Sequence, residues 1–518
     1  MSEAVHRGSR RPAVRQSEEI TTGESTSQGT LQPSGAHEPG NALGRFDQAV
    51  PLVVDLDGTL VRTDLLIESL VQLLRQHPFS ILALPLWLLK GRALLKQEIA
   101  RRTSLDVTTL PYRADLIEYL TEEKGKGRSL LLATATDQHL ARQVADHVKL
   151  FDSVLASDGT SNVSGQRKRQ LLVDQFGMYG FDYVADGNHD MPVWAAARRA
   201  IAINPSSRIR HFLSENARDH TVLKYPEASW LDYFKALRPF QWMKNLLLFV
   251  PLFAAHRIFE GKLWAKDGLA FLAFACCTSS GYLFNDLLDL SADRHHPRKR
   301  LRPLASGDVP LTYAAGMIPV LAFLSVMIGA RVSPLFLGML LLYLALTIAY
   351  SLYVKTVVLL DVIVLAGLYT LRIMAGSAAV SIWPSRWLLA FSMFLFISLA
   401  FVKRYGELVV MRSLAGAEAR ARNYEASDAE LLAAKGTASG YIAVLVLALY
   451  ITSGAGKALY GRPELMWFLC PLMLYWIGHI WLVAHRGQMH DDPVVFSLQD
   501  RTSRILLLLM LAIALLAI

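Results

Sequence analysis

The stretch Asn285-Asp-Leu-Leu-Asp-Leu-Ser-Ala-Asp-Arg294 closes a long apolar run that begins at Gly268. A carboxylate at the centre of a bilayer costs about 2.5–3.5 kcal/mol on insertion scales, so carboxylates at the end of an apolar run suggest a functional role. On a helix, Asp286, Asp289 and Asp293 are spaced i, i+3 and i+7, and we expect all three to point to one side. Such a row suits Mg²⁺, which takes oxygen ligands together with substrate phosphates. The simpler alternative is a solvated helix end. Basic residues that could hold the rest of a polyanion follow directly: His295, His296, Arg298, Lys299, Arg300 and Arg302.

The composition predicts a multidomain chain that is partly embedded in a membrane. A chain of 518 residues is too long for one domain, and its 53% of hydrophobic residues is too high a share for a wholly soluble protein. The net charge of +9 does not indicate nucleic acid, because much of the excess lies in loops between apolar stretches. The cysteines lie in apolar stretches, which argues against disulfides and a zinc site. We expect a disordered tail without a secretory signal over residues 1–45, an α/β domain over 46–205, a basic, aromatic interfacial linker over 206–236 and an all-helical membrane bundle over 237–518.

The bundle is predicted to have about nine membrane spans. Loops after the second, fourth, sixth and eighth spans carry more Lys and Arg than the opposite loops. By the positive-inside rule, the amino terminus and the polar clusters lie on the cytoplasmic side of a bacterial-type inner membrane. The spans are expected near residues 240–258, 267–288, 311–330, 334–353, 357–378, 386–402, 437–457, 463–484 and 503–518.

The α/β domain contains three short apolar stretches that we predict to be parallel strands, near residues 51–54, 129–133 and 181–185. Parallel strands deliver their carboxyl ends to one crevice of an open sheet, so the polar residues that follow them are expected to meet there. In chain order these residues are Asp55 and Asp57 after the first strand, Thr134 after the second, Lys168 ahead of an amphipathic stretch, and Asp186 and Asp190 after the third.

This ordered set resembles the haloacid dehalogenase (HAD) superfamily of phosphohydrolases. The resemblance implies that Asp55 is a nucleophile that forms an aspartyl-phosphate. It also implies that Asp57 is the general acid and base that protonates the leaving oxygen and then activates water. An inactive domain retained for docking is the alternative. The remaining implied groups are Thr134 and Lys168 for the phosphoryl oxygens, and Asp186, Asp190, Asp55 and the backbone carbonyl of Asp57 for Mg²⁺.

Residues 63–127 are predicted to form a small helical cap over the crevice. Within them, residues 79–89 are almost entirely apolar, contain Pro85 and are too short to span a membrane easily. We expect this segment to contribute to the core of the cap, with a position on the membrane surface as the alternative.

The bundle carries further polar groups in apolar surroundings, where ionisable side chains mostly face a cavity and pair with one another. A structural ion pair between Asp361 and Arg372 is one interpretation. The groups that could instead bind substrate phosphates are Lys244, Tyr350, Lys355, Arg372, Lys403 and Arg404.

About nine spans together with Asn285-Asp-x-x-Asp-x-x-x-Asp293 resemble the UbiA superfamily of intramembrane prenyltransferases. In that family the first acidic motif binds Mg²⁺ and a diphosphate, and a second DxxxD motif follows the sixth span. Here Lys403-Arg404-x-x-Glu407 stands at the second position and largely replaces acid with base. This pattern is similar to the branch that contains decaprenyl-phosphate phosphoribosyltransferases, whose substrates are a polyprenyl phosphate and 5-phosphoribosyl 1-diphosphate.

The two resemblances together imply a bifunctional, Mg²⁺-dependent enzyme in the lipid bilayer. The helical part would transfer 5-phosphoribose to the polyprenyl phosphate, and the HAD part would remove the 5-phosphate to give polyprenyl-phospho-ribose. One alternative is a prenyltransferase that uses a polyprenyl diphosphate and an aromatic acceptor, with an unrelated or regulatory HAD domain; another is a transporter with a regulatory soluble domain. The oligomeric state and the isoprenoid length stay open. The implied transferase residues are Asp286, Asp289 and Asp293 at the metal and, as substrate ligands, Asn285, Lys244, Arg294, Lys299, Tyr350, Lys355, Arg372, Lys403 and Arg404.

Overall fold

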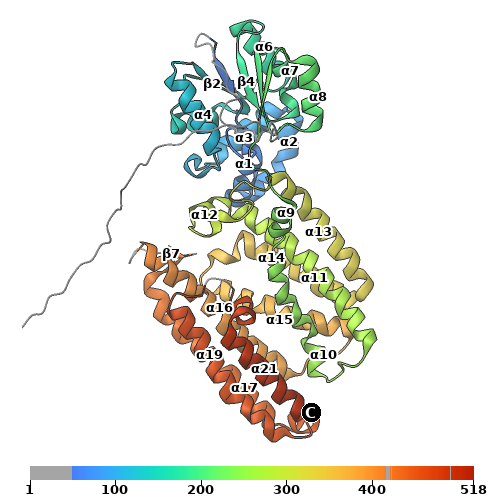
Figure 1. The fold of residues 1–518 in the computed structure, drawn as a ribbon. Helices are drawn as coiled ribbons and strands as arrows, with labels where there is room; N and C mark the ends of the chain where they lie inside the picture. Colours follow the sequence, from blue (N-terminus) through green and yellow to red (C-terminus); the bar gives the residue numbers. More distant parts are fainter. Residues whose placement is uncertain (1–49, 416–419, 422, 490–491) are drawn as a thin grey trace, which may run out of the picture. The chain divides into compact units, whose positions relative to one another are not determined.

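The computed structural model describes residues 50–415, 420–421, 423–489 and 492–518. The predicted tail over residues 1–45 lies outside these residues. An α/β part is followed along the chain by a part made mainly of long helices (Figure 1). The predicted fold class, an α/β domain followed by an apolar helical bundle, is confirmed.

The α/β part is built on one sheet of six parallel strands in the order β3-β2-β1-β4-β5-β6. The chain moves from β1 to β2 on one side and to β4 on the other, so a crevice opens at the carboxyl ends of these strands. The three predicted strands are β1, β2 and β4. The strand bounds are Leu52–Val54 (β1), Leu130–Asp137 (β2), Ser153–Ser157 (β3), Asp182–Ala185 (β4), Arg199–Ile203 (β5) and His220–Leu223 (β6).

The sheet continues past the domain boundary expected at residue 205. Helix α8 (Ser207–Asn216) leads into β6, which pairs with β5, so half of the predicted linker belongs to the α/β part. The linker prediction was wrong there because its basic residues lie on the exposed side of α8, whereas Ile209 and Leu213 pack into the core. The other helices beside the sheet are α4 (Ala114–Gly125), α5 (Gln138–Val148), α6 (Gln166–Phe176) and α7 (Met191–Trp194).

A helical cap follows β1, as predicted. Its first helix, α1 (Leu65–Gln76), begins at Asp64, whose carboxylate accepts hydrogen bonds from the backbone N–H groups of Leu66 and Ile67. The cap continues through η1 (Pro78–Ala83), α2 (Leu84–Leu89), α3 (Arg92–Arg102) and η2 (Val107–Thr109).

The expected role of residues 79–89 in the core of the cap is wrong. No residue of η1 or α2 is buried. The segment packs along α1 and α3 but has no polar side to turn outward, so most of its apolar surface stays exposed.

Seven helices among the described residues are long and apolar enough to cross a membrane. Two of the nine predicted spans differ from them. Residues 240–258 form the 3₁₀ helix η4 (Pro239–Phe249) and the short α10 (Val250–Ala254), and residues 503–518 form the 17-residue α21 (Arg501–Ala517). The first is irregular, and the second, at 17 residues, is at the short end of the range for a span. The seven helices are α11 (Gly261–Leu288), α13 (Leu311–Val332), α14 (Pro334–Leu352), α15 (Leu360–Val380), α16 (Arg386–Ala415), α17 (Ala429–Thr452) and α19 (Leu469–His485) with the preceding η9 (Pro463–Phe468).

Short elements precede or connect the long helices. They include α9 (Trp230–Ala236), α12 (Leu290–His295), η5 (Lys299–Leu301), η6 (Val354–Thr356), α18 (Gly454–Leu459) and α20 (Pro493–Gln499).

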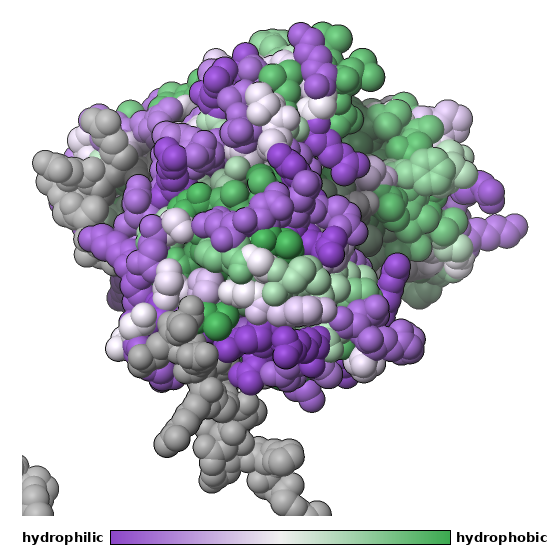
Figure 2. Space-filling view, turned by 90° about the horizontal axis from the view of Figure 1, so that it is seen from above, coloured by the Kyte–Doolittle hydropathy of each residue, from purple (hydrophilic) through white to green (hydrophobic). Residues whose placement is uncertain are grey.

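In Figure 2, hydrophilic residues dominate the face shown, and the largest hydrophobic area lies toward the right edge.

The irregular helix η4 packs directly against α15. A Cβ atom added at Gly376 would lie 1.9 Å from the backbone oxygen of Leu248, so only glycine lets the two backbones approach this closely. The same addition at Gly367, also in α15, meets nothing within 4 Å.

We therefore expect Gly376→Ala to destabilise the helical part and Gly367→Ala to leave it unchanged or slightly more stable. Overpacking costs about 1–3 kcal/mol, whereas Gly→Ala in an open helix position gains up to about 1 kcal/mol. Thermal unfolding of the full chain in detergent, followed by circular dichroism, measures the difference. Equal midpoints for the two variants would contradict the close packing of η4 on α15.

Candidate active sites

Three carboxylates gather at the carboxyl edge of the sheet. Asp55 follows β1, whereas Asp186 and Asp190 follow β4, and one oxygen from each lies within 4.8 Å of the others. No other group of three potential metal ligands occurs among the described residues. The ammonium of Lys168 donates to Asp55 (2.7 Å) and Asp190 (3.2 Å), and Tyr183 donates to Asp190 (2.6 Å). The sequence predicted that all of these groups except Tyr183 share one site.

Asp57 lies beside this cluster and is held by three donors. The backbone N–H of Leu65 donates to one oxygen (2.8 Å), and the hydroxyl of Thr136 donates to the other (2.6 Å). The predicted Thr134 lies within β2, and its hydroxyl is 3.5 Å from the same oxygen. Thr136 was missed, although the pattern Thr134-x-Thr136 in a strand puts both hydroxyls on one side.

Burial controls the protonation of this crevice. It raises the pKa of Asp55 and Asp57 above the ordinary range and the pKa of Asp186 to about 6. Burial lowers the pKa of Lys168, but the carboxylates of Asp55 and Asp190 raise it more. The three clustered carboxylates offer the hard oxygen donors that Mg²⁺ prefers, so this donor set fits the metal.

Gly58 lets the loop after β1 approach the cluster. It has φ +77°, and an added Cβ would lie 2.4 Å from Oδ2 of Asp186. The hydroxyl of Thr59 donates to the other oxygen of Asp186 (3.0 Å). The Asp-x-Asp-Gly-Thr turn therefore fixes the position of Asp186 as well as its own two aspartates.

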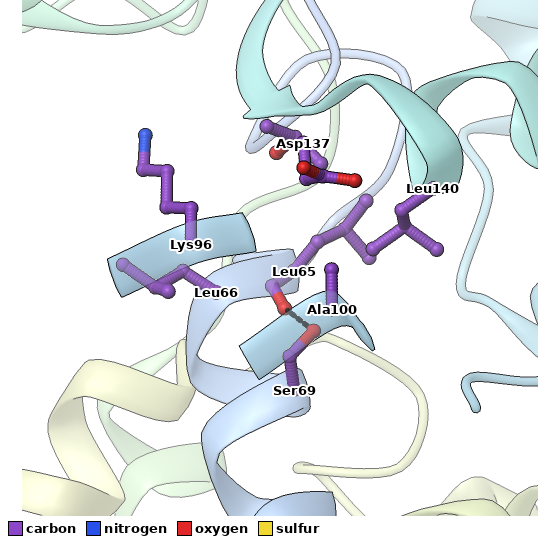
Figure 3. A pocket seen from close by; sticks show the side chains of 8 residues that line it. Leu65, Leu66, Ser69, Lys96, Ala100, Asp137 and Leu140 are labelled. Carbon is purple, nitrogen blue, oxygen red and sulfur yellow. Dashed lines mark hydrogen bonds between the residues drawn. The ribbon is translucent and has the colours of Figure 1, made fainter. Parts of the chain in front are cut away.

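A pocket lies between the cap and the crevice. Figure 3 shows side chains of α1 and α3 on one side and Asp137 and Leu140 on the other. Thr136, which holds Asp57, also lines the pocket, so the pocket lies next to the candidate catalytic groups. Lys96 points into this region and donates to the carbonyl of Ala135 (2.6 Å). The lining residues are Leu65, Leu66, Ser69, Lys96, Ala100, Thr136, Asp137 and Leu140.

A second polar group lies at the end of α11 and in α12, and we call it the acidic centre. The guanidinium of Arg238 pairs with Asp286 (Nε to Oδ2, 2.9 Å), and Arg302 contacts both Asp286 (3.5 Å) and Asp293. Asp289 instead binds Lys355 (2.7 Å). The three predicted carboxylates therefore pair with different cations, and the α-helix has a one-residue break at Asp289 between α11 and α12.

Asn285 orients the Asp289 pair, as the sequence suggested. Its side-chain amide donates to Asp289 (3.0 Å), and its carbonyl accepts from Lys355 (3.2 Å). The carboxylates of the acidic centre thus already have cationic partners. Their oxygen donors are of the type that Mg²⁺ prefers, but a metal would have to replace these cations.

A third group lies deeper between η4, α15, α16 and α20, and we call it the basic centre. Lys244 (2.8 Å) and Lys403 (3.2 Å) both contact the buried carboxylate of Asp492, and Tyr369 donates to the same carboxylate (2.6 and 2.7 Å). Burial alone raises the pKa of Asp492, but Lys244 and Lys403 hold it well below its ordinary value. Sequence reasoning missed Asp492, because an Asp before Pro493 is what the start of an ordinary helix requires.

Arg372 completes the basic centre through hydrogen bonds to neutral groups. It donates to the side chain of Asn245 (3.2 Å) and the hydroxyl of Tyr343 (2.5 Å). Asp361 pairs instead with Arg404 and accepts a hydrogen bond from Tyr424 (2.7 Å). The proposed Asp361–Arg372 ion pair is therefore wrong.

Several residues predicted to bind phosphate instead form ion pairs or hydrogen bonds within the protein. Arg404 is buried and contacts Asp361, Glu407 (2.5 Å) and Tyr350. Arg294 forms a buried pair with Glu68 (2.7 Å). Lys299 lies in η5, beyond α12. Of the predicted cations, the structure brings together Lys244, Lys403 and Arg372 at one centre and puts Lys355 at the other.

The 3₁₀ helix η4 connects the two centres. A 3₁₀ helix has 3.0 residues per turn, so side chains three positions apart eclipse one another. Arg238, at its start, contacts the acidic centre, and Lys244 contacts the basic centre. Between them, Gln241 accepts a hydrogen bond from Tyr282 (3.4 Å), whose ring lies under the Arg238 guanidinium. Arg238, which precedes the first turn of η4, is thus linked through Tyr282 and Gln241 toward Lys244, so polar groups connect the two centres.

Residues 247–500 match the UbiA prenyltransferase family. A protein of Sinorhizobium fredii named uncharacterized protein y4nM is 36% identical over 468 residues, which are 89% of this chain and 90% of that protein. The decaprenyl-phosphate phosphoribosyltransferase of Mycolicibacterium smegmatis is 31% identical over 282 residues, which are 53% of this chain and 88% of that enzyme.

The α/β part has solved HAD-family neighbours. A HAD family hydrolase from Salmonella enterica is 15% identical and covers 34% of this chain and 69% of that chain, with a TM-score of 0.25. The chain belongs to the UbiA prenyltransferase family as an integral membrane protein whose helical part follows an α/β part with HAD-like neighbours.

Proposed function

We propose that the helical part transfers 5-phosphoribose from 5-phosphoribosyl 1-diphosphate to a polyprenyl phosphate. One observation carries this proposal: the acidic and basic centres lie along the same side of η4. The donor has a diphosphate at one end and a single phosphate at the other, and the acceptor adds another phosphate. An acidic centre suited to a metal-bound diphosphate and a metal-free cationic centre match these substrates. The relative named as a phosphoribosyltransferase agrees with this reading.

The transfer step breaks the bond between the ribose anomeric carbon and the diphosphate and forms a bond to an oxygen of the lipid phosphate. Mg²⁺ held by Asp286, Asp289 and Asp293 would neutralise charge on the diphosphate. Lys355 and Arg302, released from those carboxylates, would remain within reach of the leaving group. Positioning and charge stabilisation supply most of the acceleration, because an anionic leaving group mainly needs its charge stabilised.

The basic centre would bind the remaining phosphates. Lys244 and Lys403 are held by one carboxylate, Asp492, so two cationic charges face one anionic charge before Arg372 is counted. A phosphate oxygen would accept hydrogen bonds from these cations at little structural cost, because they are already gathered.

We assign the 5-phosphate of the lipid product to the HAD crevice. Asp55 would attack the phosphorus, and Lys168 and Thr134 would hold the phosphoryl oxygens. Asp57 would protonate the departing ribose 5-oxygen and then take a proton from the attacking water. Mg²⁺ at Asp55, Asp186 and Asp190 would neutralise the phosphoryl charge. The products would be polyprenyl-phospho-ribose and inorganic phosphate.

Loop charge supports a cytoplasmic position for both sites. The predicted cytoplasmic loops carry the larger number of Lys and Arg residues. We therefore place the amino terminus and both sites on the cytoplasmic side of the inner membrane.

The direct test uses the full chain in membranes with polyprenyl phosphate, Mg²⁺ and 5-phosphoribosyl 1-diphosphate labelled separately in the ribose and in the 5-phosphate. We expect ribose label in the lipid and 5-phosphate label in inorganic phosphate. Retention of both labels in the lipid would reject the phosphatase assignment alone. Consumption of a prenyl diphosphate with an aromatic acceptor, and no labelled lipid, would support the competing prenyltransferase.

Two variants are expected to separate the reactions. Asp289→Asn removes a carboxylate charge from the acidic centre and should slow transfer by about 100-fold or more, while hydrolysis of a soluble phosphomonoester continues. Asp55→Asn removes the nucleophile, so the 5-phosphorylated lipid should accumulate. Thin-layer separation of the labelled lipids measures both effects. Loss of both reactions in each folded variant would contradict two separate sites.

Gly58→Ala should weaken Mg²⁺ binding in the HAD crevice by about 10-fold, because its Cβ displaces a metal ligand. Gly177→Ala is the matched control: Gly177 has a similar φ of +81°, but an added Cβ meets nothing within 4 Å. Hydrolysis of p-nitrophenyl phosphate at increasing Mg²⁺ concentrations measures the difference. A similar shift in both variants would attribute the effect to backbone strain and not to Asp186.

A further inference from the structure

The cap segment Pro78–Leu89 exposes much of its apolar surface. Phe79, Leu82 and Leu89 are 86%, 78% and 85% exposed, and Leu86 and Leu88 are exposed as well. Elsewhere among the described residues of the α/β part, through β6, the exposed large hydrophobic side chains are Met178 and Tyr179. A contiguous apolar patch of this kind marks an interaction surface.

The length of the segment limits what it binds. It forms two short helices, η1 and α2, which Pro85 helps to keep short. Twelve residues do not cross a bilayer, which takes roughly 20. An apolar helical segment of this length can lie in the plane of the membrane, with its side chains at the boundary between headgroups and acyl chains.

Basic residues flank the apolar surface. Lys90 and Arg92 follow it directly and are exposed, and the guanidinium of Arg102 lies 4.7 Å from the ring centre of Trp87. The acidic side chain facing this group is Glu98, which pairs with Arg101 (3.8 Å) and Arg102. The flank retains an excess of positive charge, which complements anionic lipid headgroups.

The segment also continues an existing contact with the membrane part. Near the end of α1, Arg75 donates to the backbone carbonyl of Leu288, the last residue of α11 (3.4 Å). Earlier in α1, Ile67 and Val71 pack against the cluster that contains Leu287. The chain therefore enters the apolar segment three residues after a contact with the end of a membrane-length helix.

We propose that Pro78–Leu89 binds the surface of the bilayer that holds the helical part, so that the cap admits phosphomonoesters carried by a lipid. The second half of this proposal rests on the phosphatase function proposed above. Helices α1 and α3, on either side of the segment, line the pocket beside Asp57 and Thr136. A lipid-linked phosphate reaching the crevice from the headgroup layer passes between these helices. The apolar lining from Leu65, Leu66 and Leu140 suits the part of the lipid next to the sugar.

Membrane contact is tested first, on the full chain in anionic nanodiscs. A bimane label is placed at Leu86→Cys or, as a control on an exposed side chain away from the cap, at Met178→Cys. The unsubstituted protein, with Cys276, Cys277 and Cys470, gives the labelling background. Lipids with a nitroxide near the headgroup should quench the label at position 86 and not the label at 178. No quenching at 86 overturns the proposal, as does protection of that label only in dimers of the chain.

Substrate delivery is tested with Leu82→Glu/Leu86→Glu/Leu89→Glu and with the control Met178→Glu. The triple variant should hydrolyse p-nitrophenyl phosphate like the parent but a lipid-linked phosphomonoester about 10-fold more slowly. Equal loss on both substrates, or on neither, rejects the delivery role. If the parent hydrolyses neither substrate, the phosphatase function fails, while quenching at position 86 still decides whether the segment binds the membrane.

Discussion

The helical part is organised by the need to pair charges that have left water. An unpaired buried carboxylate or ammonium is very costly, and removing one partner of a buried pair costs about 3–5 kcal/mol. Asp286, Asp361 and Asp492 are buried, and each has an arginine or lysine from another element within contact distance. These pairs join η4 to α11, α16 to α15, and α20 to both η4 and α16. The positions of the apolar helices therefore depend on a small number of polar contacts.

The two parts of the chain differ in the balance of their buried charges. In the crevice of the α/β part, three carboxylates gather around Lys168, which leaves an excess of negative charge that a cation can balance. In the helical part the carboxylates and cations are largely matched, so a charged ligand has to exchange partners with groups that already have them. The internal pairs keep these buried charges matched when no ligand is present.

The chain order of the motifs made the α/β site predictable, whereas contacts between distant helices were not. Asp55, Asp186 and Asp190 follow apolar strands, and parallel topology brings strand ends together without further information. Thr136 was missed because two threonines in one strand were equally suitable. Asp492 precedes Pro493 and resembles a common helix start, and its partners Lys244 and Lys403 are separated from it by long stretches of sequence.

For two apolar segments, one in the helical part and one in the cap, hydrophobicity alone did not predict the structure. The apolar run from 240 was predicted as a span, and it forms a 3₁₀ helix in close contact with Gly376 of α15 instead of one regular α-helix. Residues 79–89 were predicted as core because they are apolar, yet the core of the α/β part is already filled by residues such as Phe181, Tyr183 and Trp194. An apolar pattern specifies that a surface leaves water and does not specify whether protein or lipid covers it.

The 3₁₀ geometry of η4 has a consequence for how this enzyme can vary among its relatives. Each residue of such a helix advances the side-chain direction by about 120°. One residue inserted or deleted between Arg238 and Lys244 would turn one of them away from its centre, whereas a change of three residues would restore the direction but alter the distance. The spacing between Arg238 and Lys244 thus fixes how far apart the acidic and basic centres lie along η4.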